Sequence, residues 1–174
     1  MDITFAKLST PTPEIVEAFN RWENDPALIP FIRPNPAKAD LKKREPVAVE
    51  DLVKRLEHNH IYLIYEQGKL IGEMDYQIDP KHLYKRKTGS AWIGINLGEE
   101  SARGKGVGTL AMKYLEEQIK SHGLQRIELG VFEFNASALK LYQKLGYQEI
   151  ARIEDFTFWQ DRLWQDIRME KHLK

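Results

Sequence analysis

The sequence has no cysteine, no long apolar run and no excess of charge of either sign. Without cysteine there is no disulfide, no thiolate-bound zinc and no cysteine nucleophile. Lys and Arg together number 26, and so do Asp and Glu, so the net charge does not attract nucleic acid or an anionic membrane. No stretch approaches the roughly 18 apolar residues of a membrane span. We therefore expect a cytoplasmic protein with no metal ion, no nucleic acid and no membrane as partner.

The apolar share of 42% over 174 residues suits one globular domain. Strand patterns fall at 2–8, on both sides of Gln67-Gly68, at 89–97, at 125–134 and on both sides of Gln160-Asp161. Helical patterns fall at 10–25, at 47–59, after the three glycines as far as about 122–123, and at 135–147. This order predicts a single α/β domain with a mixed central sheet of about seven strands, flanked by about four helices.

A proline-rich segment at 25–46 interrupts this order and contains five of the eight prolines. Its Leu28, Ile29, Phe31 and Ile32 are too apolar for a simple linker. Long ordered loops in small domains are often lids or substrate walls. A packed connector is an equal alternative.

Three glycines stand within five residues of "ARGKGVGTLAMKYLEEQ", at 104, 106 and 108, directly before a helical pattern. Glycines let backbone N–H groups approach an anion, and a helix N-terminus adds unpaired N–H groups and a positive dipole end. Arg103 and Lys105 add two cationic donors. The segment predicts a phosphate-binding loop, although a glycine-rich turn with solvated side chains has the same composition.

Two well-known phosphate loops fit poorly. A Walker A loop requires Ser or Thr directly after the lysine, and here Gly106 follows Lys105. A dinucleotide loop requires a third glycine where Thr109 stands, and its acidic partner, Glu128, falls within a strand rather than at its end. A dinucleotide-dependent oxidoreductase therefore stays as an alternative with little support.

The segment Arg103-Gly-Lys-Gly-Val-Gly108 resembles the Arg/Gln-x-x-Gly-x-Gly/Ala loop of the GCN5-related N-acetyltransferases (GNAT). A second segment, "NASALKLYQKLGY" from Asn135 to Tyr147, is similar to that family's Asn-x-x-Ala-x-x-Leu-Tyr-x-Lys-x-Gly-Phe/Tyr motif. The likeness covers about residues 60–170. The first helix and the tail look most like the branch of ribosomal-protein N-terminal and polyamine acetyltransferases.

The resemblance implies one acetyltransferase domain over 1–174, with acetyl-CoA as co-substrate. Its cofactor core would span about 89–147, and acceptor-side elements would span about 10–60 and 148–172. Cofactor contacts would come from strand backbone, the glycine loop and the second motif, at Ile95, Asn96, Leu97, Arg103, Gly104, Lys105, Gly106, Val107, Gly108, Thr109, Asn135, Ala138 and Tyr142. The connection from strand to loop is one residue longer than is common, so we expect a bulge there.

Tyr142 has two interpretations. Its spacing with Ala138, Leu141 and Leu145 is typical of a core tyrosine. The resemblance implies instead that its hydroxyl points at the CoA sulfur and protonates the leaving thiolate. A thiol has a pKa of about 8.5 and a phenol of about 10, so this proton delivery needs no metal. Asn135 likewise suits a helix N-cap and, by resemblance, also faces the cofactor groove.

The base that deprotonates the acceptor amine is less clear. Some relatives carry a glutamate on the strand before the asparagine, and here that position is Gly130. Glu73, Asp75 and Asp155 are replacement candidates on other strands, each with a solvated face or an ion pair as the alternative. We predict Glu73 as the base.

The acceptor is predicted as a primary amine of a small molecule or of a peptide N-terminus. Gly130 keeps a non-catalytic acyl-CoA-binding module as an alternative. The basic run "KHLYKRKTG" suits a solvated hairpin tip or a contact with an anionic substrate. Trp22 and Trp159 suit core positions or walls of the acceptor pocket. The final hairpin could pair two chains in a homodimer.

Overall fold

The computed structural model describes all 174 residues. Seven strands form one sheet: β1 (Ile3–Lys7), β2 (His60–Glu66), β3 (Lys69–Ile78), β4 (Ser90–Asn96), β5 (Arg126–Phe132), β6 (Gln148–Trp159) and β7 (Arg162–His172). The α-helices are α1 (Pro13–Glu23), α2 (Ile29–Ile32), α3 (Val49–Arg55), α4 (Val107–Ser121) and α5 (Ala136–Lys144). Short 3₁₀ turns, η1 (Lys38–Lys42) and η2 (Glu100–Ala102), complete the chain. The predicted mixed α/β fold is confirmed, with one short helix more than expected.

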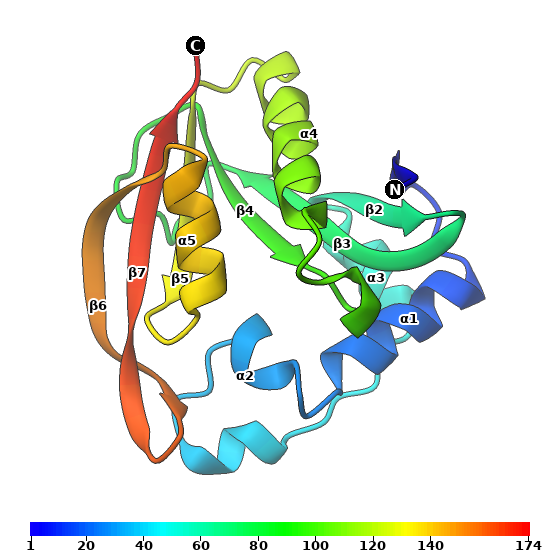
Figure 1. Cartoon of the computed structure of the whole chain (residues 1–174), viewed down its shortest axis with the longest axis horizontal. Helices are drawn as coiled ribbons and strands as arrows, with labels where there is room; N and C mark the ends of the chain where they lie inside the picture. Colours follow the sequence, from blue (N-terminus) through cyan, green and yellow to red (C-terminus); the bar gives the residue numbers. More distant parts are fainter.

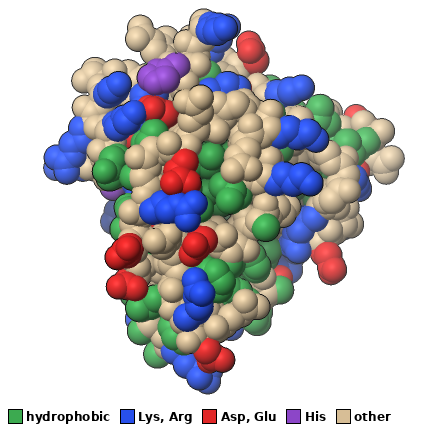
Figure 2. Space-filling model, turned by 60° about the vertical axis from the view of Figure 1, so that its left-hand side comes forward, with side chains coloured by type: hydrophobic (Ala, Val, Ile, Leu, Met, Phe, Trp, Pro, Cys, Tyr) green, Lys and Arg blue, Asp and Glu red, His purple; other side chains and the backbone are tan.

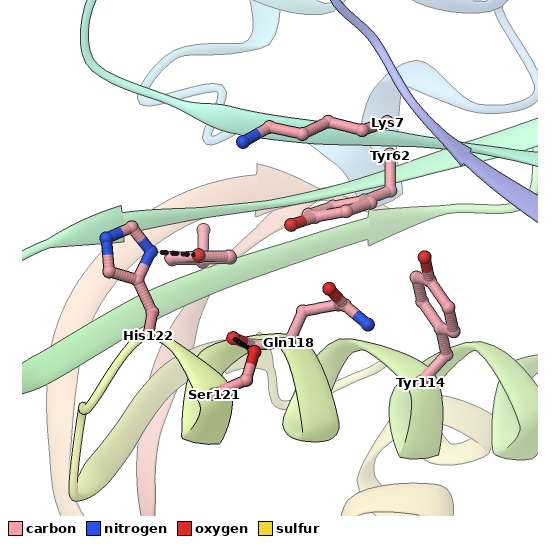
Figure 3. Close-up of a pocket in the computed structure, with 7 residues that line it drawn as sticks. Lys7, Tyr62, Tyr114, Gln118, Ser121 and His122 are labelled. Atoms are coloured by element: carbon pink, nitrogen blue, oxygen red, sulfur yellow. Dashed lines mark hydrogen bonds between the residues drawn. The ribbon is translucent and has the colours of Figure 1, made fainter.

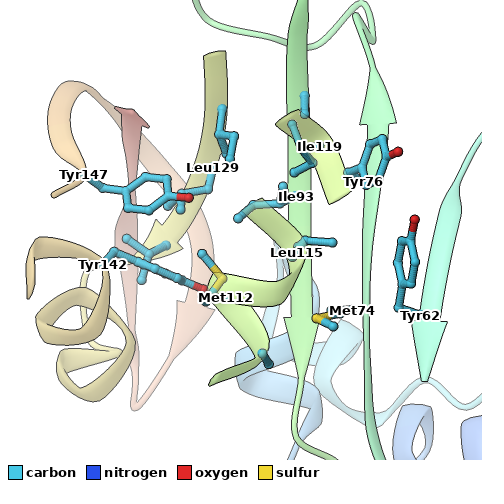
Figure 4. Close-up of a cluster of buried hydrophobic side chains, with 14 of the residues drawn as sticks. Tyr62, Met74, Tyr76, Ile93, Met112, Leu115, Ile119, Leu129, Tyr142 and Tyr147 are labelled. Carbon is cyan, nitrogen blue, oxygen red and sulfur yellow. The ribbon is translucent and has the colours of Figure 1, made fainter. Parts of the chain in front are cut away.

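The strands are ordered β1-β2-β3-β4-β5-β7-β6, and only β4 and β5 are parallel. Alternation along the strands separates two cores. Helices α4 and α5 pack on one face, where Met112, Leu115 and Ile119 of α4 meet Ile127 and Leu129 of β5 (Figure 4). Helices α1 and α3 cover the opposite face of β1–β3, around Trp22 and Leu52. The sheet thus has a helix layer on each face (Figure 1).

Local signals in the sequence set most element ends. Thr12 caps α1 by accepting a hydrogen bond from the Ile15 N–H at 3.3 Å. Asn135 caps α5 in the same way, with Ala138 N–H as donor at 3.3 Å. Both central residues of the Gln67-Gly68 turn have positive φ, at 48° and 77°, as two-residue hairpins require.

The proline-rich segment is a packed connector. Asn35 is fully buried, and its N–H donates to the Thr157 hydroxyl of β6 at 2.8 Å. Its carbonyl accepts from the Phe158 N–H at 2.7 Å. These hydrogen bonds fix the segment to the final hairpin, and α2 carries Phe31 toward the end of β5. The segment therefore forms a wall beside the sheet.

No helix has the length and apolar character that crossing a membrane requires. On the face shown in Figure 2, Lys and Arg side chains gather toward the right-hand side, whereas both signs mix elsewhere. The charge balance of the whole sequence thus coexists with local basic areas.

Candidate active site

The sheet opens between its two parallel strands. Pairing of β4 with β5 is limited to Ser90–Trp92 against Arg126–Glu128. From Ile93 onward β4 pairs only with β3, and from Leu129 onward β5 pairs only with β7. Beyond these pairs the two strands diverge, which leaves a gap in the sheet (Figure 1). Backbone at such a gap is free to bind a ligand that supplies the missing partners.

The glycine loop stands at the end of this gap and presents unpaired donors. No backbone N–H from Gly104 to Thr109 donates a hydrogen bond within the protein. Gly104 and Gly106 have φ of 73° and 86°, and a Cβ there would meet no atom within 4 Å. The strained conformation, not crowding, therefore requires glycine at both positions. Open N–H groups before the fifteen-residue α4 form a site suited to an anion.

Two cations border the loop, and both are held by the protein. Arg103 donates to the carbonyls of Leu97 and Gly98 at 3.2 and 3.3 Å. Lys105 pairs with Glu66 at 2.8 Å. Arg103 thus links the loop to the end of β4. The β3–β4 register runs without a shift from Ile78–Ala91 to Glu73–Asn96. Just beyond it the Glu99 N–H donates to the Ile71 carbonyl at 3.1 Å, one residue out of that register, so the connection contains the expected extra residue.

Tyr142 lies on α5 and is 7% exposed. Figure 4 shows its ring extending from α5 toward Met112 of α4, across the space between the two helices. The Tyr142 hydroxyl has no hydrogen-bond partner in the protein. Among side-chain oxygens and nitrogens that are fully shielded from solvent, only Oε2 of Glu73 lacks a partner. The Tyr142 hydroxyl is therefore not fully shielded, and solvent or a ligand can reach it. Burial of the ring raises the pKa of Tyr142 to about 12, so the phenol stays protonated at neutral pH.

Tyr147 packs beside Tyr142, with ring centroids 5.9 Å apart, but its environment differs. Its hydroxyl donates to Glu116 at 2.8 Å, and Glu116 also pairs with Lys171 at 2.8 Å. Burial and the Glu116 carboxylate both raise the pKa of Tyr147. Of these two tyrosines, only Tyr142 has a free hydroxyl.

Carboxylates gather on the opposite face of the sheet, beside β4. Glu73 and Asp75 of β3 pair in register with Asn96 and Gly94. Burial raises the pKa of Glu73, with a further contribution from the Asp75 charge. Burial likewise raises the pKa of Asp75, and the nearby Arg55 guanidinium opposes this. Oε2 of Glu73 is shielded from solvent and has no hydrogen-bond partner.

An ion pair between two helices borders these carboxylates. Arg55 of α3 binds Glu23 of α1 through two hydrogen bonds, at 2.6 and 2.8 Å. The charges of both residues influence Glu73 and Asp75. Three carboxyl groups thus share one guanidinium, which leaves the area acidic. Asp155, the third candidate base, lies in the β6 bulge with φ of 51° and lines a pocket with Glu133, Glu154 and Arg162.

Two further segments from the sequence analysis meet on the far face of the sheet. Glu128 is fully buried, pairs with Arg126 at 2.6 Å and accepts hydrogen bonds from the N–H groups of Tyr84 and Lys85. It is therefore not exposed to a nucleotide ribose. The same N–H groups hold the backbone of the run "KHLYKRKTG" over β5, while most of its side chains, such as Tyr84 at 56%, are exposed.

The two tryptophans named above have different surroundings. Trp22 is 1% exposed, and a Cβ on Gly98 would lie 2.2 Å from its indole, so it is a core residue that requires this glycine. Trp159 belongs to an aromatic cluster whose neighbouring ring centroids lie 5.5–6.2 Å apart and which contains Phe31, Phe132, Phe134, Phe156, Trp159 and Trp164. No sequence pattern predicts this cluster, because four separate segments contribute to it.

A separate pocket of about 350 Å³ lies between α4 and the first strands (Figure 3). Three tyrosines line it together with Lys7, Gln118, Ser121 and His122. Tyr76 and His122 are hydrogen-bonded there at 2.7 Å. None of the residues that line this pocket belongs to β4 or β5, the two strands that form the gap. The pocket and the gap are therefore separate places in the molecule.

Comparison with known proteins agrees with this geometry. The family model described as "Acetyltransferase (GNAT) family" matches residues 16–147. The chain belongs to the GNAT family. Solved GNAT structures share its fold, since a ribosomal-protein-alanine N-acetyltransferase from Brucella melitensis has a TM-score of 0.75 at 18% identity, with 99% of this chain and 100% of that one covered.

Two further similar proteins have names that refer to polyamines. A spermidine N-acetyltransferase from Vibrio cholerae, solved with CoA and spermine, has a TM-score of 0.75 at 18% identity, with 98% of this chain and 95% of that one covered. The spermine/spermidine N(1)-acetyltransferase of Bacillus subtilis is 33% identical over 86 residues, or 49% of this chain and 57% of that protein. The matched region therefore spans little more than half of that curated relative.

Proposed function

We propose that this protein is an N-acetyltransferase that transfers an acetyl group from acetyl-CoA directly to a primary amine. The observation that carries the proposal is the gap between β4 and β5, which has unpaired loop N–H groups at its end and the half-buried carboxyl groups of Glu73 and Asp75 beside β4. Acetyl-CoA would supply the acetyl group as an activated thioester. Family membership supports this assignment.

The residues present fit this co-substrate. The N–H groups from Gly104 to Thr109, with Arg103 and Lys105 beside them, would hold the pyrophosphate. The β4 backbone from Ile95 to Leu97 would hold the amide-containing arm, because β5 provides no partner there. Asn135 and Ala138, which are hydrogen-bonded at the start of α5, would border the same cofactor. No residue in this set requires a metal, and no group of metal-ligating side chains occurs.

Tyr142 would be the general acid. Its hydroxyl is protonated, free of partners and directed between α4 and α5. A thiolate leaving in the same apolar surroundings would also have a raised pKa, because burial disfavours every anion. The phenol therefore need not match the pKa of about 8.5 that a thiol has in water.

Glu73, with Asp75, would accept the proton of the incoming ammonium. Burial raises the pKa of Asp75 to about 7, so this group can accept a proton near neutral pH, and the pKa of the neighbouring Glu73 is raised as well. The nitrogen gives one proton to this pair and bonds to the acetyl carbon as the carbon–sulfur bond breaks. Tyr142 protonates the sulfur and recovers a proton from the nitrogen. No cysteine exists to carry the acetyl group, so the transfer is direct.

The acidic surroundings of Glu73 favour a cationic acceptor, such as a small-molecule amine or a peptide N-terminus. Calorimetry with acetyl-CoA at about 0.1 mM, within the usual range of substrate constants, is the first test. Thiol release with spermidine, n-butylamine and an alanine-starting peptide is the second. Absence of binding would refute the proposal. Binding without turnover on any amine would favour the non-catalytic acyl-CoA-binding module instead.

A further inference from the structure

Two glycines lie level with one another across the gap. If the pairing of Trp92 with Glu128 continued, Gly94 of β4 would be opposite Gly130 of β5. Both belong to the sheet face that lies away from α4 and α5, because they alternate with the core residues Ile93 and Leu129. Neither glycine contributes a side chain to the gap. Any side-chain group that acts on a ligand beside Gly94 and Gly130 must therefore come from the neighbouring strands β3 and β7.

Each glycine lies beside an aspartate of the next strand in the sheet, on the side away from the gap. A Cβ on Gly94 would lie 3.2 Å from Oδ1 of Asp75, on β3. A Cβ on Gly130 would lie 2.7 Å from Oδ2 of Asp166, on β7, and 3.1 Å from Trp92. The second distance is too short for any side chain unless Asp166 moves. The absence of a side chain at 130 thus makes room for a carboxylate that reaches in from β7.

Asp166 ends a buried network in which three acidic and three basic side chains alternate. Its Oδ2 accepts from Arg168 Nε at 2.8 Å, and Arg168 approaches Glu128 at 3.7 Å. Arg126, Glu170 and Lys85 continue the network away from the gap, with contacts of 2.6–2.7 Å. Each of the other five members therefore contacts at least one side chain of opposite charge within the network.

The other oxygen of Asp166 is available. Asp166 as a whole is only 3% exposed, and its Oδ1 has no hydrogen-bond partner. This oxygen is nevertheless not fully shielded from solvent, so a ligand atom can reach it. It lies 3.2 Å from the Cβ position of Gly130. Aromatic rings from Trp92 and Phe156 pack on the neighbouring Arg168. A carboxylate oxygen without a hydrogen-bond partner, with the Trp92 ring 3.1 Å from the same Cβ position of Gly130, suits a primary ammonium on an alkyl chain.

Resting on the proposed function, we propose that Asp166 Oδ1 binds the acceptor ammonium from the β7 side of the gap, opposite Glu73 and Asp75. The acceptor nitrogen is then held between carboxylates of two strands that are not neighbours in the sheet. Asp166 orients the nitrogen, and the pair on β3 removes its proton. This two-sided arrangement excludes a tertiary ammonium, which has a single N–H donor, and gives a primary ammonium, which has three, one donor for each side with one to spare.

The test compares Asp166→Asn with Glu170→Gln. Both changes remove one carboxylate of the same network on the same face of β7, but Glu170 is remote from the gap. We expect Asp166→Asn to lower kcat/KM for n-butylamine at least about tenfold, the loss typical of a hydrogen bond to a charged group. Its affinity for acetyl-CoA and the activity of Glu170→Gln should remain within about twofold of wild type. Equal amine kinetics in the two variants would overturn the inference while leaving the acetyltransferase proposal intact.

A second test moves the carboxylate from position 166 to position 130. Gly130→Glu alone should lower activity, because its Cβ would crowd Asp166. In an Asp166→Ala background the same change should raise activity, since the new carboxylate then occupies the vacated space. A double variant no more active than Asp166→Ala would count against the inference.

Binding of n-butylammonium to the protein–CoA complex, followed by NMR, tests the contact without turnover. Weakening by Asp166→Asn but not by Glu170→Gln is the expected result even if no acetyl transfer is found. Equal binding to both variants, or no binding to the wild-type complex, would overturn the inference.

Discussion

Replacing Tyr142 with phenylalanine separates chemistry from packing. The ring would stay in place, and the hydroxyl that is lost has no hydrogen-bond partner in the protein. No internal hydrogen bond is therefore broken, and the free energy of unfolding should change by less than about 0.5 kcal/mol. If the hydroxyl is the general acid, kcat should fall about 100-fold or more, which corresponds to about 2.7 kcal/mol of transition-state stabilisation.

Tyr147→Phe is the matched control. Its hydroxyl donates to Glu116 at 2.8 Å, so its removal should lower stability by about 1.5–3 kcal/mol, as for other hydrogen bonds to charged groups. It should leave kcat within about threefold of wild type, because this hydroxyl does not face the gap. The two variants thus predict opposite patterns, one with loss of rate and the other with loss of stability.

Thiol release measured with a disulfide reagent gives the rate, and the lack of cysteine means that the protein adds no background signal. Calorimetry gives the acetyl-CoA affinity, and urea denaturation gives the stability. A Tyr142→Phe enzyme with wild-type kcat would refute the assignment of the acid. So would parallel losses of kcat, acetyl-CoA affinity and stability, because they would indicate a packing role.

Three further changes test the site. Gly106→Ala should weaken acetyl-CoA binding more than Gly123→Ala does, although both strain a residue of positive φ by about 1–2 kcal/mol, and calorimetry on the two variants measures the difference. Glu73→Gln should reduce amine turnover at neutral pH about 100-fold with unchanged acetyl-CoA affinity, and unchanged turnover would remove Glu73 as the base. Burial raises the pKa of Asp75 to about 7, so the folded chain holds this proton more tightly than the unfolded chain, and wild-type stability should fall as pH rises from about 4 to about 7. Asp75→Asn should abolish that part of the fall in pH-dependent denaturation, and an unchanged pH profile would contradict the shift.

Features encoded by neighbouring residues were predictable from the sequence. The caps at Thr12 and Asn135 and the turn at Gln67-Gly68 each depend on a few consecutive residues. The glycine loop is also local, since its conformation follows from the glycines themselves. The element order and the mixed sheet followed from these signals together with hydrophobic periodicity.

Features that depend on strand register were not predictable. The position of Asp166 over Gly130 requires the β5–β7 pairing, and no pattern near either residue indicates it. The basic composition of the loop containing Tyr84 indicates exposed side chains, but nothing in it indicates that its backbone N–H groups bind the buried Glu128. Burial of Trp22 against Gly98 likewise joins segments that are distant in sequence. Long-range contacts of this kind decide which charged residues are available for chemistry.

The short β4–β5 pairing has a consequence for how the protein responds to its ligand. Only three residue pairs connect the half of the sheet containing β1–β4 to the half containing β5–β7. A molecule held between the halves would add contacts to both, and each tenfold rise of its concentration above Kd would add about 1.4 kcal/mol to the stability. Amide exchange along Ile93–Asn96 and Leu129–Phe132 should then slow together on saturation. The resistance of the folded chain to unfolding would thus report how much acyl-CoA surrounds it.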